Sequence, residues 1–375
     1  MAHAYTPGLK VLHETIILKE RRLPLKGTVT VEKGQAVTPD DIVATTDLPG
    51  NVQMVNVANI LNIDPADIHE AMQVKEGMKV KKGEQIAETK GLFGLFKSNV
   101  EAPVDSTVEV ISDVTGQIVL REPPIPVEID AYMSGHIQDV IPEEGVMIKS
   151  EGVFIQGIFG IGGESRGELA TLTDSREDEI SAAMITPEMK GKIIVGGSLI
   201  SLSAYKKALQ LQVAGVVVGG FNYFDLEEIL GYTLGVAITG QEDLITSLIL
   251  TEGYGKIRMG QRTFELLKEN HGKFASVNGA TQIRAGVIRP EIVIPLKKEE
   301  LKGDQKDADA SEGIKAGSLV RVIRAPYFGR MGKVIELPSD LRKMESETMV
   351  RVAIIEIDGE NIDIPRANLE MIETD

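Results

Sequence analysis

The chain must build its hydrophobic cores almost without aromatic side chains. Aromatic residues make up only 4% of the 375 residues, and tryptophan is absent. The cores therefore have to be packed from Val, Ile, Leu and Met. The 38 glycines favour many tight turns, which is typical of a β-rich fold. A chain of this length can form two or three domains, each with its own core.

The composition excludes several kinds of chemistry. Without cysteine the chain can form no disulfide, thiolate nucleophile or zinc–thiolate site. The five histidines are scattered, and none has a partner at metal-binding spacing. No nucleotide-binding loop and no nucleophile–base pair can be identified. We therefore predict no catalytic residue, no metal and no cofactor, and lean towards a protein that is not an enzyme.

The N-terminal residues MAHAYTPGLK contain no apolar signal core, and no stretch reaches the ~18 apolar residues of a membrane helix. We expect a cytoplasmic protein that does not associate with membranes. The formal net charge of -16 argues against wrapping naked nucleic acid. Any contact with nucleic acid must therefore be local.

Residues 1–170 are predicted to be β-rich. A weak repeat has the copies VEKGQAV, around Gly34, and VKEGMKV, around Gly77, which lie 43 residues apart. Residues 142–148 resemble a third copy. Each copy is expected to form a strand, a glycine turn and a second strand, although a generic hairpin signal would look the same. A short helix is expected near residues 64–68, with Asp64 as its N-cap and Pro65 at its first position.

The second copy begins a longer pattern, VKEGMKVKKGEQIAETKG followed by VEAPVDSTVEVISDVTGQIV. Over residues 74–121 it resembles a barrel-sandwich hybrid (biotinyl/lipoyl-like) domain. Ser106 replaces the final glycine of that pattern. Carrier domains present a modifiable lysine in a Met-Lys-Met setting, which Lys97 lacks. The resemblance is therefore to the non-carrier versions of the fold, in which it serves as scaffold.

Residues 171–296 are predicted to form a small α/β domain with parallel strands. Expected strands are 192–195, 216–218, 235–238 and 290–295. Expected helices are 203–213, 226–230 with Asp225 as its cap, and 263–269. The run Gly157–Glu164 is interpreted as a turn before this domain.

Polar residues and glycines gather at the predicted strand ends of this domain, where open α/β sheets bind ligands. Glycines beside a helix start could hold an anion. The possible ligand pocket consists of Gly196, Gly197, Ser198, Thr239, Glu242, Glu252, Arg284 and Arg289. An alternative for Glu242 and its acidic neighbour is a helix start or a solvated loop.

Residues 297–312 (KKEELKGDQKDADASE) are predicted to be a flexible linker, because they are too polar to bury a core. Beyond it, residues 313–375 contain the only strongly basic stretch. Five basic and no acidic residues lie between Gly313 and Ile335. This stretch also contains two adjacent aromatic residues on a predicted turn.

The segment GSLVRVIRAPYFGRMGKV, from Gly317 to Val334, resembles a KOW motif, including the glycine at 332. KOW motifs occur in NusG-type transcription factors and in large-subunit ribosomal proteins. The resemblance implies a small SH3-like barrel, with Val320 and Val322 on one face of a strand and Arg321 on the other. Its expected binding residues are Arg321, Arg324, Tyr327, Phe328, Arg330 and Lys333.

Arginines can clamp phosphates and aromatic rings can stack on unpaired bases. In the alternative interpretation, Tyr327 and Phe328 plug the barrel end and the arginines form a solvated face. The sequence as a whole thus predicts a multidomain α+β protein. Its expected function is a non-enzymatic binding protein of the transcription or translation machinery, with RNA, a ribonucleoprotein or a protein as partner. The alternative is an enzyme or small-anion sensor with its site in the α/β domain.

Overall fold

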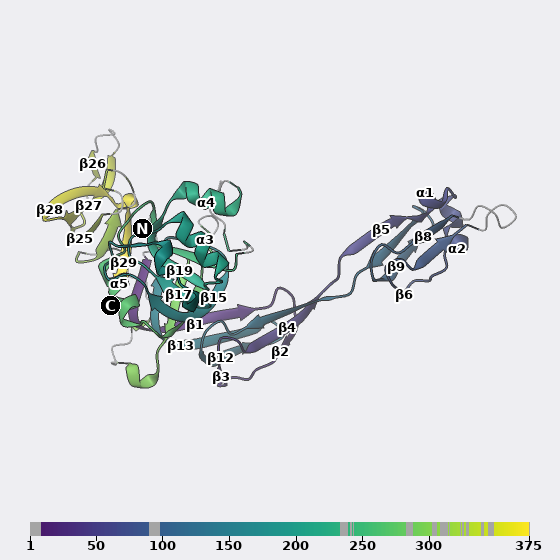
Figure 1. Ribbon diagram of the computed structural model, residues 1–375, viewed down its shortest axis with the longest axis horizontal. Helices are drawn as coiled ribbons and strands as arrows, with labels where there is room; N and C mark the ends of the chain where they lie inside the picture. Colours follow the sequence, from purple (N-terminus) through teal and green to yellow (C-terminus); the bar gives the residue numbers. More distant parts are fainter. Residues whose placement is uncertain are drawn as a thin grey trace.

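The structure is a computed structural model. It describes residues 9–89, 98–232, 239–240, 242, 244–282, 288–301, 306–307, 314, 316–322, 324, 326–327, 330–338, 341–343 and 349–374. The fold is β-rich, with several separate sheets and a few short helices. Figure 1 shows an elongated molecule, in which a body carries one module at the end of a narrow arm and a second module on its other side.

The body is organised around a long mixed sheet. Its longest strands, β1 (Leu9–Arg22) and β13 (Gly145–Gln156), pair antiparallel. β13 continues to β22 (Glu291–Pro295), which is followed across the sheet by β21 (Phe274–Asn278) and β15 (Glu164–Thr171). The first half of β15 pairs antiparallel with β21 and its second half parallel with β17. The sheet is therefore continuous across residue 170, where the sequence suggested a boundary.

Parallel strands follow on the far side of β15. β17 (Ile193–Val195), β19 (Gly215–Phe221) and β20 (Ser247–Tyr254) are parallel neighbours, and β14 (Phe159–Ile161) closes the row antiparallel to β20. Helices α3 (Leu202–Gln210), α4 (Tyr223–Leu230) and α5 (Gln261–Glu269) accompany these strands. The two cores of the body consist mainly of buried Ile, Val and Leu, as the composition requires.

Several local expectations for this region need correction. Helix α4 begins three residues earlier than predicted, because the Asn222 side chain accepts a hydrogen bond from the Phe224 amide and acts as the cap in place of Asp225. β19 extends through Gly219 and Gly220 to Phe221, three residues beyond the end of the predicted strand 216–218. The predicted strand 235–238 lies outside the described residues. The sequence missed β20, the third parallel strand.

The arm is formed by β2 (Thr28–Val29), β4 (Ile42–Leu48) and β11 (Ile125–Asp130). It narrows to two chain segments, which contain Gly50 and Glu122 and lead to the distal module. A Cβ at Gly50 would lie 2.0 Å from the Glu122 carbonyl oxygen, so only glycine fits this crossing. β12 (Gly135–Ile141) and β3 (Ala36–Val37) pair at the base of the arm, beside β13.

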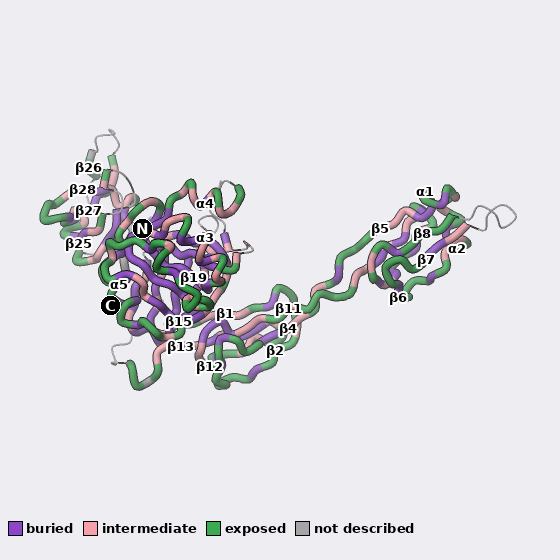
Figure 2. Tube along the Cα trace, in the orientation of Figure 1, coloured by how far each residue is buried: buried purple, intermediate pink, exposed green. Residues whose placement is uncertain are grey.

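The distal module comprises residues 51–122, with 90–97 outside the described residues. One sheet has the order β5 (Val52–Asn56), β10 (Gln117–Arg121), β9 (Ser106–Ser112) and β6 (Lys79–Val80). A second pairs β7 (Gln85–Glu88) with β8 (Asn99–Glu101). Helices α1 (Val57–Leu61) and α2 (Ile68–Ala71) complete a separate aliphatic core. In Figure 2 the buried residues of the distal module are separate from those of the body.

Of two sequence expectations for the β-rich N-terminal part of the chain, one is confirmed and the other is confirmed in part. Asp64 caps the 3-10 helix Pro65–Asp67 by accepting a hydrogen bond from the Ala66 amide. The two repeat copies share the glycine turn, with Gly34 and Gly77 both at φ +86°, and the two-residue strand after it, but the strand expected before the turn is found only in the first copy, as β2. The third copy differs, because Gly145 opens β13 directly after a hairpin turn.

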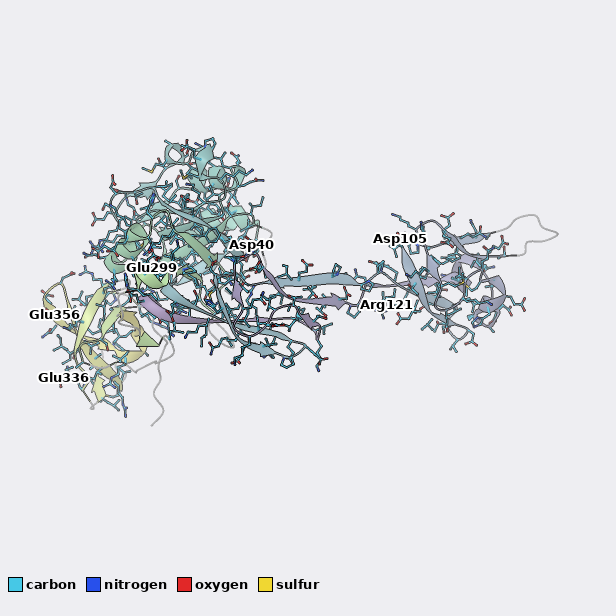
Figure 3. The ribbon with its side chains drawn as sticks, turned by 90° about the horizontal axis from the view of Figure 1, so that it is seen from below. Asp40, Asp105, Arg121, Glu299, Glu336 and Glu356 are labelled. Atoms are coloured by element: carbon cyan, nitrogen blue, oxygen red, sulfur yellow. The ribbon has the colours of Figure 1, made fainter. Side chains whose placement is uncertain are left out.

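The C-terminal module comprises residues 314–374. It contains β24 (Leu319–Val322), β25 (Met331–Glu336), β26 (Leu341–Lys343), β27 (Met349–Ile357), β28 (Glu360–Pro365) and β29 (Leu369–Thr374), paired antiparallel among themselves. β29 also runs parallel to β1 of the body. Figure 3 shows this module, with Glu336 and Glu356, on the opposite side of the body from Asp105 and Arg121 of the distal module.

Between the body and the C-terminal module, the segment predicted as a linker contains the 3-10 helix Lys298–Glu300 and the two-residue strand β23 (Lys306–Asp307) beside β1. Residues 302–305 and 308–312 of that segment lie outside the described part of the chain. Across the described ranges, no helix has the length and apolar character needed to cross a membrane.

Candidate functional site

One ion pair joins a residue of the predicted RNA-binding site to a residue of the predicted ligand pocket. Arg321, expected to bind RNA, lies 2% exposed on β24, and its Nη1 is 2.9 Å from the Glu252 Oε2 of β20. The other Glu252 oxygen accepts a hydrogen bond from the Gly260 amide at 2.9 Å. Arg321 also donates to the carbonyl oxygens of Thr251 and Glu252, each at 3.3 Å. Arg321 therefore connects the C-terminal module to the body and is not presented to solvent.

The strand alternation explains this placement. Val320 and Val322 enter the core of the C-terminal module, as predicted, so Arg321 must point to the opposite face. Leu319 and Met331, on the same side as Arg321, pack against the core of the body. A small cavity of about 30 Å³ remains beside the Arg321–Glu252 pair.

The other KOW-type residues are placed differently. Arg324, Arg330 and Lys333 are exposed, and Arg330 forms an ion pair with Asp358. Tyr327 is half-buried and packs against the core of the C-terminal module, while Phe328 lies outside the described residues. Close packing requires glycine at position 332, since a Cβ there would lie 2.5 Å from the Glu356 carbonyl oxygen.

The glycine pair after β17 approaches other backbone closely. A Cβ at Gly197 would lie 2.5 Å from the Ser175 carbonyl oxygen. Ser198 is 1% exposed, and its hydroxyl donates to the Glu177 carbonyl oxygen at 2.7 Å. The space around Gly197 and Ser198 is therefore filled by the chain's own carbonyl groups, which would repel an anion, and the space beside Gly196 is filled by the Ile180 side chain.

Thr239 and Glu242 do come together, around the glycine-rich run Gly157–Glu164. The Thr239 hydroxyl donates to the Gly160 carbonyl oxygen at 2.7 Å. One Glu242 oxygen accepts hydrogen bonds from the amides of Gly162 (2.9 Å) and Gly240 (2.7 Å). These side chains therefore satisfy backbone groups of β14 and of the turn after it, which is a structural task, and the run interpreted as a turn contains a strand.

The remaining members of the predicted ligand pocket are not joined to them. Gly160 pairs with Ile249, and Glu252 lies three residues further along β20, about 10 Å away for an extended strand. Arg289 is half-buried two residues before β22. Arg284 lies outside the described residues.

A charge network that the sequence did not indicate lies where the arm meets the body. Arg21 of β1 contacts Asp130 at 3.0 Å, and its two terminal nitrogens bind the Glu164 carboxylate at 2.6 and 2.8 Å. Arg166 forms an ion pair with the second Asp130 oxygen and lies 3.2 Å from Asp40. Although burial opposes it, the hydrogen bond to Glu164 raises the pKa of the Arg21 guanidinium.

Tyr132 lies at the centre of this network. It is 1% exposed and has a φ of 65°, a left-handed conformation that is strained for an aromatic residue. Lys19 and Arg21 lie 5.6 and 5.5 Å from its ring centroid. Burial, reinforced by the nearby Glu291 carboxylate, holds the pKa of the Tyr132 hydroxyl well above its ordinary value. In the sequence this network is indicated only by the charges of Lys19 and Arg21 at alternate positions of β1, because the partners of Arg21 are over a hundred residues away.

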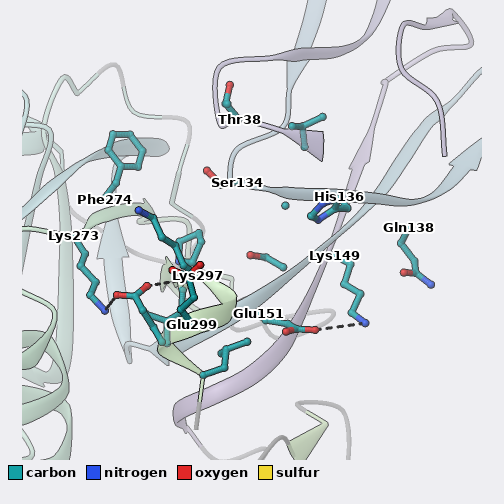
Figure 4. Close-up of a pocket in the computed structure, with 17 residues that line it drawn as sticks. Thr38, Ser134, His136, Gln138, Lys149, Glu151, Lys273, Phe274, Lys297 and Glu299 are labelled. Carbon is teal, nitrogen blue, oxygen red and sulfur yellow. Dashed lines mark hydrogen bonds and ion pairs between the residues drawn. The ribbon is translucent and has the colours of Figure 1, made fainter. Parts of the chain in front are cut away.

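A cavity of about 1030 Å³ opens beside β13, between the start of β12 and the end of β22 (Figure 4). β12 pairs with β13 only as far as Lys149, and β22 begins to pair at Gly152, so the two strands diverge here. Lys149 lies 3.9 Å from Glu151 and Lys273 2.8 Å from Glu300. The other charged groups that line the cavity are His136, Lys297 and Glu299.

Within the described ranges, no three potential metal-ligating side chains form a cluster. Compared with known proteins, the chain matches no protein-family model and no curated protein.

Proposed function

We propose that the protein is a non-enzymatic binding protein of the transcription or translation machinery, which contacts RNA or a ribonucleoprotein through its C-terminal module. The observation that carries this proposal is the exposure of Arg324, Arg330 and Lys333 on the part of the module that is not engaged by the body. Arg321 holds the module in place, so that these cations face outward. Guanidinium groups in such positions bind phosphate oxygens.

Strand order supports the KOW-type interpretation of this module. β24 pairs with both β25 and β29, and β27 pairs with β25 and β28, which is the sequence of neighbours expected of an SH3-like barrel. The two small sheets of the distal module, packed on one aliphatic core, similarly support a barrel-sandwich-like scaffold. In this proposal the distal module serves as a second contact surface, held away from the body by the arm.

The test is binding of fluorescein-labelled single-stranded and stem–loop RNAs to the full chain at two salt concentrations. The variant Arg324→Ala/Arg330→Ala should weaken binding. The slope of log K against log [salt] should become shallower by about one to two, as expected for the loss of one or two phosphate contacts. Arg342→Ala/Arg351→Ala is the matched control, since it removes two exposed arginines from the same module. Absence of salt-sensitive binding, or equal loss in both variants, would overturn the proposal.

A small-anion sensor is the second candidate function, and the cavity beside β13 favours it. The residues that the sequence assigned to such a site mostly hold backbone groups, whereas the cavity is lined by four basic side chains, His136, Lys149, Lys273 and Lys297, against three carboxylates, of which Glu151 and Glu300 pair with Lys149 and Lys273. Inorganic phosphate should then raise the Tm of the protein, and Lys149→Ala/Lys297→Ala should remove the rise. Lys26→Ala/Lys33→Ala is the control, because both lysines are exposed and neither lines the cavity.

A further inference from the structure

Four aromatic rings form a continuous row on the body, in a chain that has only seven Tyr and nine Phe. The ring centroids of Phe159 and Tyr254 are 5.2 Å apart, those of Tyr254 and Tyr223 are 5.3 Å apart, and those of Tyr223 and Phe224 are 5.9 Å apart. The row runs from a buried end at Phe159 to an open end at Phe224, which is 76% exposed. Tyr254 is 40% exposed. We call Tyr223, Phe224 and Tyr254 the aromatic ledge.

The local structure fixes the ledge in place. Tyr254 is the last residue of β20 and is the register partner of Phe221, the last residue of β19. Asn222 follows at once and caps α4 through its hydrogen bond to the Phe224 amide at 2.9 Å. Tyr223 and Phe224 therefore occupy the first turn of a capped helix at the carboxyl end of the parallel strands. The rings pack near-perpendicular, with interplanar angles of 88° and 78°, and Phe224 and Tyr254 keep 76% and 40% of their surface exposed to a ligand.

The surroundings of the ledge are acidic. Helix α4 contributes Asp225, Glu227 and Glu228 and contains no basic residue, although Glu228 forms an ion pair with Lys206 of α3. The two cations that follow Tyr254 are neutralised within the molecule, since Lys256 pairs with Glu179 and Arg258 lies 3.6 Å from Glu177. Partial desolvation and a hydrogen bond to the Glu227 carboxylate raise the pKa of the Tyr223 hydroxyl, so this carboxylate lies against the ledge itself. A negative field at exposed rings repels nucleic acid and attracts cations.

We infer that the aromatic ledge is the docking site of an extended polypeptide segment rich in arginine or lysine. Guanidinium groups stack on Tyr and Phe faces, and the Asp225 and Glu227 carboxylates of α4 pair with the same cations. The ring spacings of 5.3 and 5.9 Å are close to the roughly 6.6 Å that separates same-side residues of an extended chain. Basic residues at alternate positions could thus contact successive rings. This surface lies on the body and does not depend on the RNA contact proposed for the C-terminal module.

The experiment measures binding of a fluorescein-labelled dodecapeptide of alternating Arg and Ser to the full chain by fluorescence anisotropy. Phe224→Ala should weaken binding at least fivefold, and Glu227→Gln should weaken it about twofold at low salt. Phe274→Ala is the matched control, since Phe274 is a 47% exposed phenylalanine outside the ledge, and it should leave the affinity unchanged. Because Phe224 is largely exposed, its replacement should also leave the Tm unchanged.

Two outcomes overturn the inference. If the two phenylalanine variants lose affinity equally, or neither does, the peptide is held only by the net negative charge of the chain. If an alternating Glu and Ser peptide or a single-stranded RNA binds the chain and is released by Phe224→Ala, the ledge takes a partner of a different class. Failure of RNA to bind the C-terminal module leaves this measurement unaffected, so the two proposals fail separately.

Discussion

Arg321 and Glu252 form a buried ion pair across 69 residues of sequence, with Nη1 of the arginine 2.9 Å from Oε2 of the glutamate. Both side chains are almost fully withdrawn from solvent. The pair joins β24 of the C-terminal module to β20 of the body, and Gly260 holds the second oxygen of Glu252. An arginine that resembles part of a nucleic-acid-binding motif thus fixes the position of that module.

Replacing Arg321 by Met should destabilise the attachment of the C-terminal module by about 3–5 kcal/mol, because the Glu252 carboxylate is left buried without its counter-charge. Native-state hydrogen exchange of the β24 and β29 amides measures this loss. The double variant Arg321→Met/Glu252→Gln should recover part of it, since the carboxylate is then neutral. Arg342→Met is the control, because its pair with Asp363 is exposed and should contribute less than about 1 kcal/mol. Equal effects of Arg321→Met and Arg342→Met would contradict the prediction.

Gly332→Ala should destabilise the C-terminal module by about 1–3 kcal/mol, the usual cost of overpacking. The new methyl group would lie 2.5 Å from both the Glu356 carbonyl oxygen and the Ile355 Cγ2. Gly163→Ala serves as the control, since the nearest atom to its Cβ would be the Gly240 oxygen at 3.4 Å. Urea unfolding followed by circular dichroism compares the two, and a smaller effect at Gly332 than at Gly163 would show that β25 and β27 can move apart.

Local patterns predicted much of the fold because their causes are local. The cap at Asp64, the positive φ of Gly34 and Gly77, and the burial of Val320 and Val322 follow from a few neighbouring residues. The start of α4 was missed because Asn222 and Asp225 can both cap a helix, and only the packing of the following turn selects between them.

The candidate sites depended on long-range contacts and were correspondingly harder to predict. Thr239 and Glu242 lie close together, but the Thr239 hydroxyl donates to the Gly160 carbonyl oxygen and the Glu242 carboxylate accepts from the chain's own amides. Strand β20 was missed because Thr251 and Glu252 interrupt its apolar run, and Glu252 is tolerated there only because Arg321 neutralises it. No periodicity in the sequence indicates the Arg321–Glu252 ion pair.

Asp130→Asn should loosen the joint between the arm and the body. Asp130 ends β11 of the arm and receives both Arg21 of β1 and Arg166 of β15, so one substitution weakens both ion pairs. Because the chain has no native cysteine, spin labels can be attached at Asp47→Cys on the arm and Glu269→Cys on the body. The distance distribution between the labels should broaden. Asp139→Asn, which removes an exposed pair with Lys33, should leave it unchanged. Equally narrow distributions in both variants would show that Tyr132 and the backbone pairing hold the joint without these charges.

Acid should release the 3-10 helix Lys298–Glu300 from the body. The hydrogen bond from Lys273, followed by that from the Lys297 amide, holds the pKa of Glu300 below its ordinary value. A carboxyl group whose pKa is lowered by folding stabilises the folded form above its unfolded pKa, and this contribution is lost as pH falls through the folded value. The chemical shift of the Lys297 amide, followed by NMR from pH 6 to 3, should therefore change below about pH 4. Glu300→Gln should abolish that change. If the chemical shift of the Lys297 amide still changes with pH in the variant, the change belongs to another group that lines the same cavity.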